Sequence, residues 1–272
     1  MNIDAFFYAH PVFRLDEYIA WKEGLGTKNR ASIHSSLHYY LKEGRLLSIR
    51  RGLYAVIPPN TRPDQAWIDP YLVAAVISPD SVLAYHSALE LHGVAYSTFG
   101  KFTFKTQKKI KPFYFQNQLF QPSSIPTAIR AKENMSKAGV ITMDRQGILI
   151  RITDIEHSFV DALDRIELCG GLEEVTRSLE AITALNSESV IEYARQFKSS
   201  VLAAKLGYFL EQRKDAFAVA ENSLKLLLKM KPKSPQYLDV HQKRGCLYIK
   251  RWNLMVPEKI INRRFEEPDY DV

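Results

Sequence analysis

Apolar residues in the stretch from residue 27 to 56 follow first a helical and then a strand pattern. Four of them share one face of a predicted helix over residues 28–43, because they lie at i, i+4, i+7 and i+8: Ile33, Leu37, Tyr40 and Leu41. Thr27 is the expected N-cap, since its hydroxyl can accept from an amide of the first turn. Gly44 is expected to end the helix in the left-handed conformation.

Two short apolar runs follow that helix. Leu46–Ile49 and Leu53–Val56 are joined by Arg50-Arg51-Gly52, which predicts a tight hairpin with a basic tip. Upstream, residues 3–9 predict a first helix that stops at Pro11, and residues 14–23 predict a second that Gly24 and Gly26 end. Three helices and a hairpin make up a winged helix-turn-helix, in which the second helix braces the third, the third reads the major groove and the hairpin grips the flanking backbone.

The chain length of 272 residues suits two domains, each with its own core. Residues 57–64 carry three prolines, which can continue neither a helix nor a central strand. We therefore predict a winged helix-turn-helix domain at 1–57, a linker at 58–68 and a second domain at 69–272. The expected fold class is α+β, with a larger mixed α/β C-terminal domain that has a helical section.

Within the second domain the pattern changes along the chain. Helices are predicted at 71–77, after a Pro at the first helical position, and again from Val82 through Tyr85, Leu89 and His92 to Gly93. Strands follow at four places: 101–106, 112–115, 140–144 and 148–152. The stretch 116–137 has no assignment. Four helices are predicted beyond Asp154: 155–166, 172–182, 189–197 and 200–212. Residues 224–229, 246–249 and 252–255 fit either strands or short helices.

Charge is distributed unevenly. Residues 28–51 hold six Lys/Arg against one Glu, and residues 225–251 hold eight Lys/Arg against Asp239, whereas residues 154–192 hold ten acids against Arg165 and Arg177. Such segregation favours a polyanionic partner for the basic parts. For the first segment a motif coincides with the charge, which favours nucleic acid. For the last segment a solvated basic face is the simpler interpretation.

Two cysteines are too few for a disulfide framework or a zinc site. The N-terminus has no basic region followed by an apolar run, and no stretch is long enough to span a bilayer, so a cytoplasmic location without membrane contact is expected.

Catalytic constellations are weak. The sequence contains neither a phosphate-binding loop nor a GxGxxG motif. His86, Glu90 and His92 are the nearest approach to a metal cluster, but His92 lies off the shared face, and hydrogen-bonded helix histidines are the simpler interpretation. Asp161 and Asp164 at i, i+3 could form a carboxylate pair but are more often an exposed helix face. We predict no catalytic residue, no metal, no cofactor and no enzymatic activity.

The polar face of the 28–43 helix supplies the candidate DNA contacts. Side chains near the start of a recognition helix reach bases most readily, which favours Asn29, Arg30, His34 and Ser35, whereas Lys28, Lys42 and Arg45 are expected at phosphates. Arg50 and Arg51 are expected to contact phosphates from the wing tip. The full candidate set is Lys28, Asn29, Arg30, Ser32, His34, Ser35, His38, Lys42, Arg45, Arg50 and Arg51. Tyr39 could stack on a base. The alternative for Arg30 and His34 is ordinary solvent exposure.

The chain resembles the AbiEi family, the antitoxin and transcriptional regulator of the AbiE abortive-infection toxin–antitoxin system. The residues that carry the resemblance are the wing, Gly44-Arg45-Leu46 to Arg51-Gly52-Leu53-Tyr54; the segment from Asp69-Pro70-Tyr71 through residues 84–93, AYHSALELHG; residues 155–164, IEHSFVDALD, with Gly170-Gly171; and residues 206–211, LGYFLE. The wing motif alone is shared by many regulators, and the resemblance fades after about residue 215.

The resemblance implies a non-enzymatic repressor that binds inverted repeats in its own promoter through the winged helix. It also implies a C-terminal domain that neutralises a nucleotidyltransferase-like toxin, without a stable complex between the two. Two copies on a repeat are expected, as monomers side by side or as a weak dimer. Two alternatives remain: an enzyme whose winged helix is a docking module for a catalytic C-terminal domain, and an interaction module using the acidic 154–192 helices.

Overall fold

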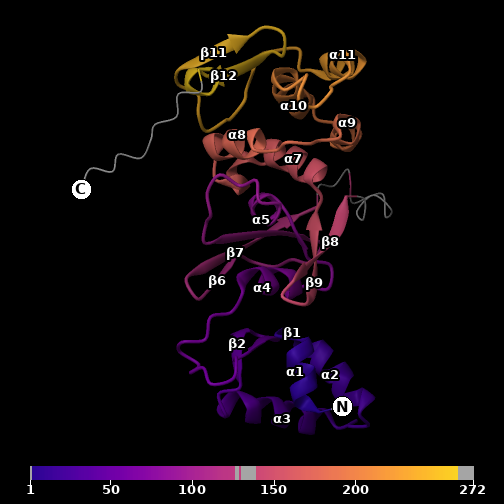
Figure 1. Ribbon diagram of the computed structural model, residues 1–272, viewed down its shortest axis with the longest axis vertical. Coiled ribbons are helices and arrows are strands. Elements are labelled where there is room, and N and C mark those ends of the chain that lie inside the picture. The colour runs from indigo at the N-terminus through magenta and orange to yellow at the C-terminus, as the bar shows by residue number, and fades with distance from the viewer. Residues whose placement is uncertain (1, 126–128, 130–138, 263–272) are drawn as a thin grey trace, which may run out of the picture. The chain divides into compact units, whose positions relative to one another are not determined.

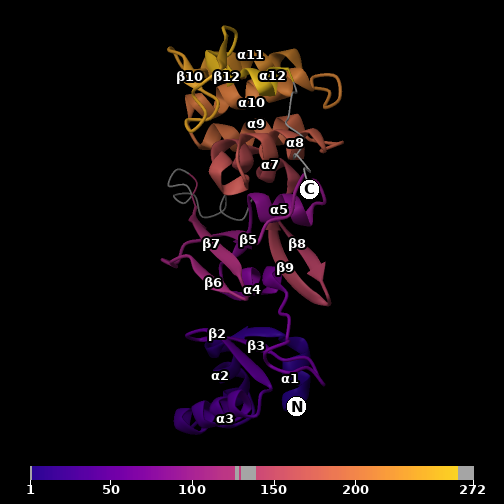
Figure 2. The same ribbon diagram turned by 90° about the vertical axis from the view of Figure 1, so that its left-hand side faces the viewer.

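The computed structural model describes residues 2–125, 129 and 139–262 (Figures 1 and 2). By its internal contacts the chain divides into two compact units, which are described separately. Unit 1 comprises residues 1–83, 100–124 and 142–152, and unit 2 comprises residues 84–99, 125–141 and 153–272.

Unit 1 begins with a winged helix-turn-helix. Its elements, in chain order, are α1 (Ile3–Ala9), β1 (Val12–Arg14), α2 (Leu15–Gly24), α3 (Arg30–Lys42), β2 (Leu46–Arg50) and β3 (Leu53–Val56). The three strands form an antiparallel sheet in the order β1-β3-β2, with Val12 opposite Ala55 and Leu46 opposite Val56. The predicted helices and hairpin are therefore confirmed, and β1 is an addition that the sequence pattern did not indicate.

Aromatic side chains hold this small fold together. Phe6 lies at the centre of a cluster in which its ring approaches that of Phe13 at 5.2 Å, Tyr18 at 5.6 Å and Trp21 at 4.8 Å. Ile33 and Leu37 of α3 are buried against the same cluster. Burying apolar side chains of this size stabilises the fold by roughly 1.5–3 kcal/mol each. This burial fixes which face of α3 packs inward, and the remaining surface of the helix is exposed to solvent.

The ends of α3 differ in part from the prediction. Asn29, not Thr27, is the N-cap: its Oδ1 accepts from the amides of Ala31 at 2.9 Å and Ser32 at 3.4 Å. With Asn29 as the N-cap, the first helical residue is Arg30, two residues later than predicted. At the other end Gly44 has φ +69°, as predicted for the residue that stops the helix.

The remainder of unit 1 is built on a six-stranded sheet with the order β6-β7-β5-β4-β9-β8. Its strands are β4 (Val82–Leu83), β5 (Lys101–Thr106), β6 (Phe113–Phe115), β7 (Gln118–Ser124), β8 (Val140–Arg145) and β9 (Ile148–Thr153). β5 runs parallel to β7 and β4 parallel to β9, whereas β4–β5 and β6–β7 are antiparallel. Helix α4 (Pro70–Val76) packs on β4 and β5.

The predicted strands at 101–106, 112–115, 140–144 and 148–152 are confirmed within a residue or two, and β7 fills part of the unassigned stretch. The remainder of that stretch up to residue 137, apart from residues 125 and 129, lies outside the described residues. The predicted helix from Val82 to His92 is wrong in its first part: Tyr85 has φ +57°, and the chain forms β4 before it. Its second part is confirmed as α5 (His86–Leu91), which ends before Gly93. The helical spacing of apolar residues gave a wrong prediction here because residues 82–89 are all buried, so the sequence pattern does not distinguish a buried strand from a buried helix.

Unit 2 is mainly helical. Its helices are α5, α7 (Ile155–Asp164), the 3-10 helix η1 (Ile166–Cys169), α8 (Leu172–Glu180), α9 (Ser187–Gln196), α10 (Ser200–Gln212), α11 (Glu221–Met230) and α12 (Glu258–Ile261). A small sheet in the order β10-β12-β11 completes it, from β10 (Gln236–Tyr237), β11 (Cys246–Ile249) and β12 (Leu254–Pro257). Its core contains Trp252, which is fully buried and lies so close to Gly207 of α10 that a Cβ there would come within 2.1 Å of the ring.

The α+β fold class is thus correct, and residues 58–68 contain neither helix nor strand. The contact division nevertheless places the winged helix in one unit with part of the predicted second domain, and the predicted domain boundary stays a prediction. Among the described residues no helix combines the length and apolar character required to cross a membrane.

Candidate nucleic-acid interface

The outward face of α3 and the residues just before it carry most of the predicted DNA contacts. Nine of the eleven candidates are exposed: Arg51 in the wing, and Lys28, Asn29, Arg30, Ser32, His34, Ser35, His38 and Lys42 on α3 or just before it. Arg30, His34 and His38, at i, i+4 and i+8, form one exposed stripe beside the buried Ile33 and Leu37, and Ser35 continues the exposed surface away from them. This face presents cations, hydroxyls and imidazoles without a large apolar side chain among these positions, which is the composition expected where a helix meets phosphates and base edges.

Arg30 stands at the first turn of α3 with its side chain 73% exposed. Its Nε lies 4.0 Å from Glu23 Oε1 at the end of α2, the limit for an ion pair. An exposed pair at that distance contributes well under about 1 kcal/mol, so a phosphate or a guanine edge can displace the carboxylate at little cost. Arg30 is therefore available to a ligand.

The inner side of α3 is fixed by a buried hydroxyl pair. Tyr18 of α2 and Ser36 of α3 share a hydrogen bond of 2.8 Å, and the Ser36 hydroxyl lies 2.8 Å from the carbonyl oxygen of Ile33. Burial raises the pKa of Tyr18, although the bond with Ser36 works in the other direction. The phenol thus stays neutral and ties α2 to α3, which sets the orientation of the exposed face.

Arg45 behaves differently from the exposed set. It is half-buried and forms an ion pair with Asp4 of α1, while its guanidinium lies 5.1 Å from the centre of the Phe7 ring and 5.3 Å from that of Tyr40. These contacts join α1 to the end of α3. The residue predicted at a phosphate therefore has a structural role already.

The two wing arginines differ in burial. Arg51 is exposed in the turn, next to Gly52 with φ +80°. Arg50 is the last residue of β2 and is half-buried: its guanidinium lies 5.0 Å from the centre of the Phe113 ring, and its Nη1 is buried without a hydrogen-bond partner among the described residues. The turn is therefore shorter than the predicted Arg50-Arg51-Gly52, and Arg51 is the wing residue that can reach a phosphate freely.

Tyr39 is 58% exposed, so its ring is accessible, as base stacking would require. One feature near the wing escaped the sequence reasoning. The connection between β5 and β6 holds Lys108, Lys109 and Lys111, all exposed. The Lys-Lys-Ile-Lys run was visible in the sequence, but its 50-residue separation from the wing gave no reason to associate it with the winged helix.

The His86, Glu90 and His92 grouping does not form a metal site. His86 Nε2 lies 3.3 Å from Glu90 Oε1 and 3.1 Å from the Ser97 carbonyl oxygen, whereas His92 Nε2 lies 2.7 Å from the carbonyl oxygen of Thr153. Both are hydrogen-bonded histidines in unit 2, as the simpler interpretation predicted. Among the described residues no group of three His, Cys, Asp or Glu could hold a metal ion.

Glu174 of α8 completes this buried network. Its Oε1 accepts from the Ser97 amide at 2.9 Å and from the Ser178 hydroxyl at 3.1 Å, and Glu90 Oε1 accepts from the Phe99 amide at 3.0 Å. The carboxylates thus fix the backbone of residues 97–99. Sequence reasoning missed Glu174, because its backbone partner, the Ser97 amide, is 77 positions away.

Asp161 and Asp164 are not the exposed pair that their spacing suggested. Asp161 is fully buried and accepts from the Tyr193 hydroxyl at 3.0 Å, whereas Asp164 is half-buried. Burial and the neighbouring Asp161 carboxylate raise the pKa of Tyr193 well above its ordinary value. The Tyr193 phenol is therefore a neutral donor, and its hydrogen bond to Asp161 joins α7 to α9 inside unit 2.

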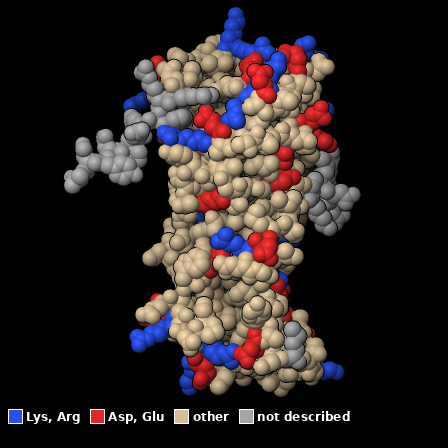
Figure 3. All heavy atoms as spheres, in the orientation of Figure 1, with Lys and Arg blue, Asp and Glu red and all other residues tan. Residues whose placement is uncertain are grey.

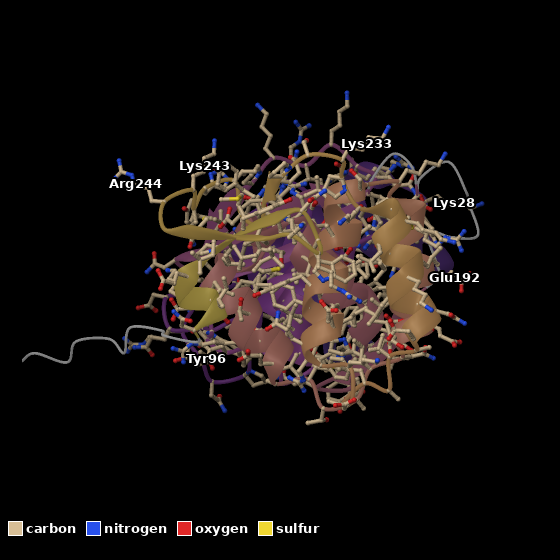
Figure 4. All side chains as sticks on the ribbon, turned by 90° about the horizontal axis from the view of Figure 1, so that it is seen from above. Lys28, Tyr96, Glu192, Lys233, Lys243 and Arg244 are labelled. Atoms are coloured by element: carbon tan, nitrogen blue, oxygen red, sulfur yellow. The ribbon has the colours of Figure 1, made fainter. Side chains whose placement is uncertain are left out.

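The basic 225–251 segment lies on the surface of unit 2. Lys233, Lys243 and Arg244 are exposed, and Figure 4 shows them projecting away from the body of the unit. In Figure 3 Lys and Arg atoms at this end of unit 2 are interspersed with Asp and Glu atoms. Residues 240–245 and 257–259 surround an open hollow of about 670 Å³, which Glu258 shares with the cations. This mixture fits a solvated face, the simpler interpretation of this segment.

Comparison with known proteins supplies a fold likeness. No family model matches the chain, and no curated protein matches it. Among solved structures, the chain is similar to the crystal structure of RV2827C protein from Mycobacterium tuberculosis, with a TM-score of 0.59 and 13% sequence identity over 93% of this chain and 89% of that one. At this identity the likeness shows the fold alone.

Proposed function

We propose that the protein is a duplex-DNA-binding transcriptional repressor that places α3 in the major groove and the β2–β3 wing against the neighbouring backbone. The observation that carries this proposal is the exposed polar surface of α3, where Arg30, His34, Ser35 and His38 all face outward while Ile33 and Leu37 anchor the helix in the core. The surrounding elements follow the helix, strand and wing order of winged-helix DNA-binding domains.

The electrostatics of the face agree with this assignment. Lys28, Arg30, Lys42 and Arg51 are exposed cations on α3, its lead-in and the wing, and the exposed acids near them include Glu23, Glu43 and Asp16, the last paired with Arg14. Each cation that meets a phosphate releases counterions and adds affinity without sequence preference. Arg30 sits where the start of a reading helix approaches base edges, so we assign it to sequence recognition.

We further propose that the protein acts as an antitoxin of the AbiEi type and represses its own operon from inverted repeats. The proposal extends the resemblance in the wing and in residues 69–93, 155–164 and 206–211. The cognate toxin would be a nucleotidyltransferase-like protein, neutralised without a stable complex. In unit 2 several residues of these segments are buried and held by polar partners, as Asp161 is by Tyr193 and His86 by Glu90. Among the described residues they form no metal cluster, and we propose no catalytic role for them.

The deciding experiment is a gel-shift titration of the full chain with the duplex upstream of its own reading frame, against a scrambled duplex of equal length. We expect Arg30→Ala to reduce the preference for the upstream duplex by about 1–3 kcal/mol. Arg51→Ala should weaken binding to both duplexes and reduce the salt slope by about one unit.

Glu43→Gln is a matched control on the same element, since it changes the charge next to α3 without removing a cation. It should retain the preference for the upstream duplex. If the unmodified protein binds the upstream and scrambled duplexes equally, or if neither arginine variant changes retention, then the assignment of α3 and the wing is wrong.

A further inference from the structure

The wing of the winged helix lies beside a second basic element that comes from a distant part of the chain. The connection between β5 and β6, residues 107–112, contains Lys108, Lys109 and Lys111, three exposed cations, and no acid. Arg50 of β2 lies over the ring of Phe113, the first residue of β6, at 5.0 Å. This contact places the start of β6 against the wing next to its turn, residues 51–52.

A shared hollow gives an independent indication of the same proximity. Ile110, from the middle of the connection, and the wing-turn residues Arg51 and Gly52 line one hollow of about 420 Å³. Asp16 also lines it, but this carboxylate is paired with Arg14 at 3.2 Å. The wing turn and the lysine-bearing connection therefore border the same recess, which Ile110 lines between its sequence neighbours Lys109 and Lys111.

The connection is anchored at its base. Asp80 Oδ1 accepts from the Thr106 hydroxyl at 2.8 Å, and Oδ2 accepts from the Gln107 amide at 2.6 Å, while the Lys108 amide donates to the Thr106 hydroxyl at 3.1 Å. A carboxylate that receives a backbone amide and a hydroxyl holds the start of the connection in one conformation. The lysines thus emerge from a fixed point, which reduces the entropy lost when they bind a charged surface.

We infer that Lys108, Lys109 and Lys111 extend the wing into a second backbone-binding element, which contacts phosphates of the duplex beyond those that Arg51 reaches. The inference rests on the proposed DNA-binding function and adds a site that the winged helix alone does not contain. Duplex DNA is the occupant because the lysines continue the positive surface of Arg51, and a duplex that crosses a wing carries its phosphates onward at regular spacing. The lysines carry no base recognition in this arrangement, since point charges on flexible stems bind phosphates without sequence preference.

The test compares a triple variant, Lys108→Gln with Lys109→Gln and Lys111→Gln, with the unmodified full chain. Because three phosphate contacts are lost, the slope of the logarithm of affinity against the logarithm of salt concentration should fall by about two to three units. The ratio of affinities for the upstream and scrambled duplexes should stay the same. The triple variant to arginine should restore the slope, since it keeps the charges.

The control is an equal loss of charge elsewhere: Arg195→Gln with Lys198→Gln and Lys225→Gln, three exposed cations of unit 2. This control should leave the slope within about half a unit of the unmodified value, because only charges near phosphates release counterions. If the control lowers the slope as much as the test variant, net charge explains the effect and the inference is overturned.

A length series gives a second readout. Shortening the duplex on the wing side by about 5 base pairs, half a helical turn, should weaken the unmodified protein and leave the glutamine variant unaffected. Equal sensitivity of both proteins would overturn the inference. If Arg30→Ala still erodes the preference while the lysine variant behaves as the unmodified chain, the second element is wrong and the winged-helix function stands. If the unmodified chain retains no duplex, both proposals fail.

Discussion

The outer face of α3 and the buried network between α5 and α8 use the same kinds of residue in opposite ways. On α3, Arg30, His34 and His38 are exposed, and Arg30 reaches its carboxylate neighbour only at 4.0 Å. In unit 2, His86 and Glu174 are almost completely buried and are joined to neighbours by hydrogen bonds of about 3 Å. The polar residues of the second region maintain the fold, whereas those of the first are available to a ligand.

The difference teaches how to separate function from stability in this chain. A buried polar group must keep its partner, since an unsatisfied one costs about 1–3 kcal/mol. An exposed polar group contributes little to stability and can be changed freely unless a ligand requires it. The comparison therefore predicts large stability effects without specific binding effects in unit 2, and the reverse on α3 and the wing.

The sharpest contrast is between two helical glycines. Gly207→Ala in α10 would place a Cβ 2.1 Å from the Trp252 ring, and we expect the free energy of unfolding to fall by about 3 kcal/mol or more. Gly24→Ala in α2 meets nothing within 4 Å and should raise it by up to about 0.5 kcal/mol. Urea denaturation of both variants tests this, and similar midpoints for the two would contradict the packing described around Trp252.

A second contrast uses two glutamates. Glu174→Ala removes the acceptor of the Ser97 amide and the Ser178 hydroxyl, so it should lower the free energy of unfolding by about 2–3 kcal/mol. Glu23→Ala removes an exposed carboxylate and should change it by less than about 0.5 kcal/mol. Thermal melts distinguish the two. A melting temperature for Glu174→Ala equal to that of the unmodified chain would show that the buried network is dispensable.

The wing arginines provide a third contrast within one hairpin. Arg50→Ala loses the contact with Phe113 and should destabilise the protein by about 1 kcal/mol. Arg51→Ala should leave the free energy of unfolding within about 0.5 kcal/mol, because its side chain is exposed. Denaturation measured without DNA separates these effects from binding. If the two variants were equally stable, the contact between Arg50 and Phe113 would contribute nothing measurable to the free energy of unfolding.

The smallest expected effect is the pH dependence of stability that comes from Asp80. Burial of Asp80 would raise its pKa, but hydrogen bonds from Ser78, the Gln107 amide and Thr106 outweigh it, so the folded pKa lies below its ordinary value. A lowered folded pKa contributes stability that is present above about pH 4 and is lost as pH falls through the folded value. Asp80→Asn should therefore lower stability by no more than about 1 kcal/mol at neutral pH, and the difference should vanish in strong acid. A difference that grows below pH 4 would contradict the sign.

Local patterns predicted much of this structure. Ile33 and Leu37 identified the inner face of α3, and with it the exposed candidates, because helical periodicity depends only on nearby residues. The hairpin strands and Gly44 were equally local. The sequence pattern failed where partners are distant: Arg50 packs on Phe113, 63 positions away, and Asp161 pairs with Tyr193. It also failed at Tyr85, whose positive φ is imposed by the surrounding core rather than by its own preference.

The cap at Asn29 limits what that residue can offer to a nucleic acid. Both lone pairs of its side-chain oxygen are engaged by amides of the first turn, so only the NH₂ group is left to face outward. Bidentate pairing with adenine requires a donor and an acceptor on the same amide, and releasing the oxygen would fray the start of the helix at a cost of about 1 kcal/mol. Asn29 can therefore serve phosphates, guanine or thymine carbonyls, while adenine recognition would have to come from elsewhere on the helix.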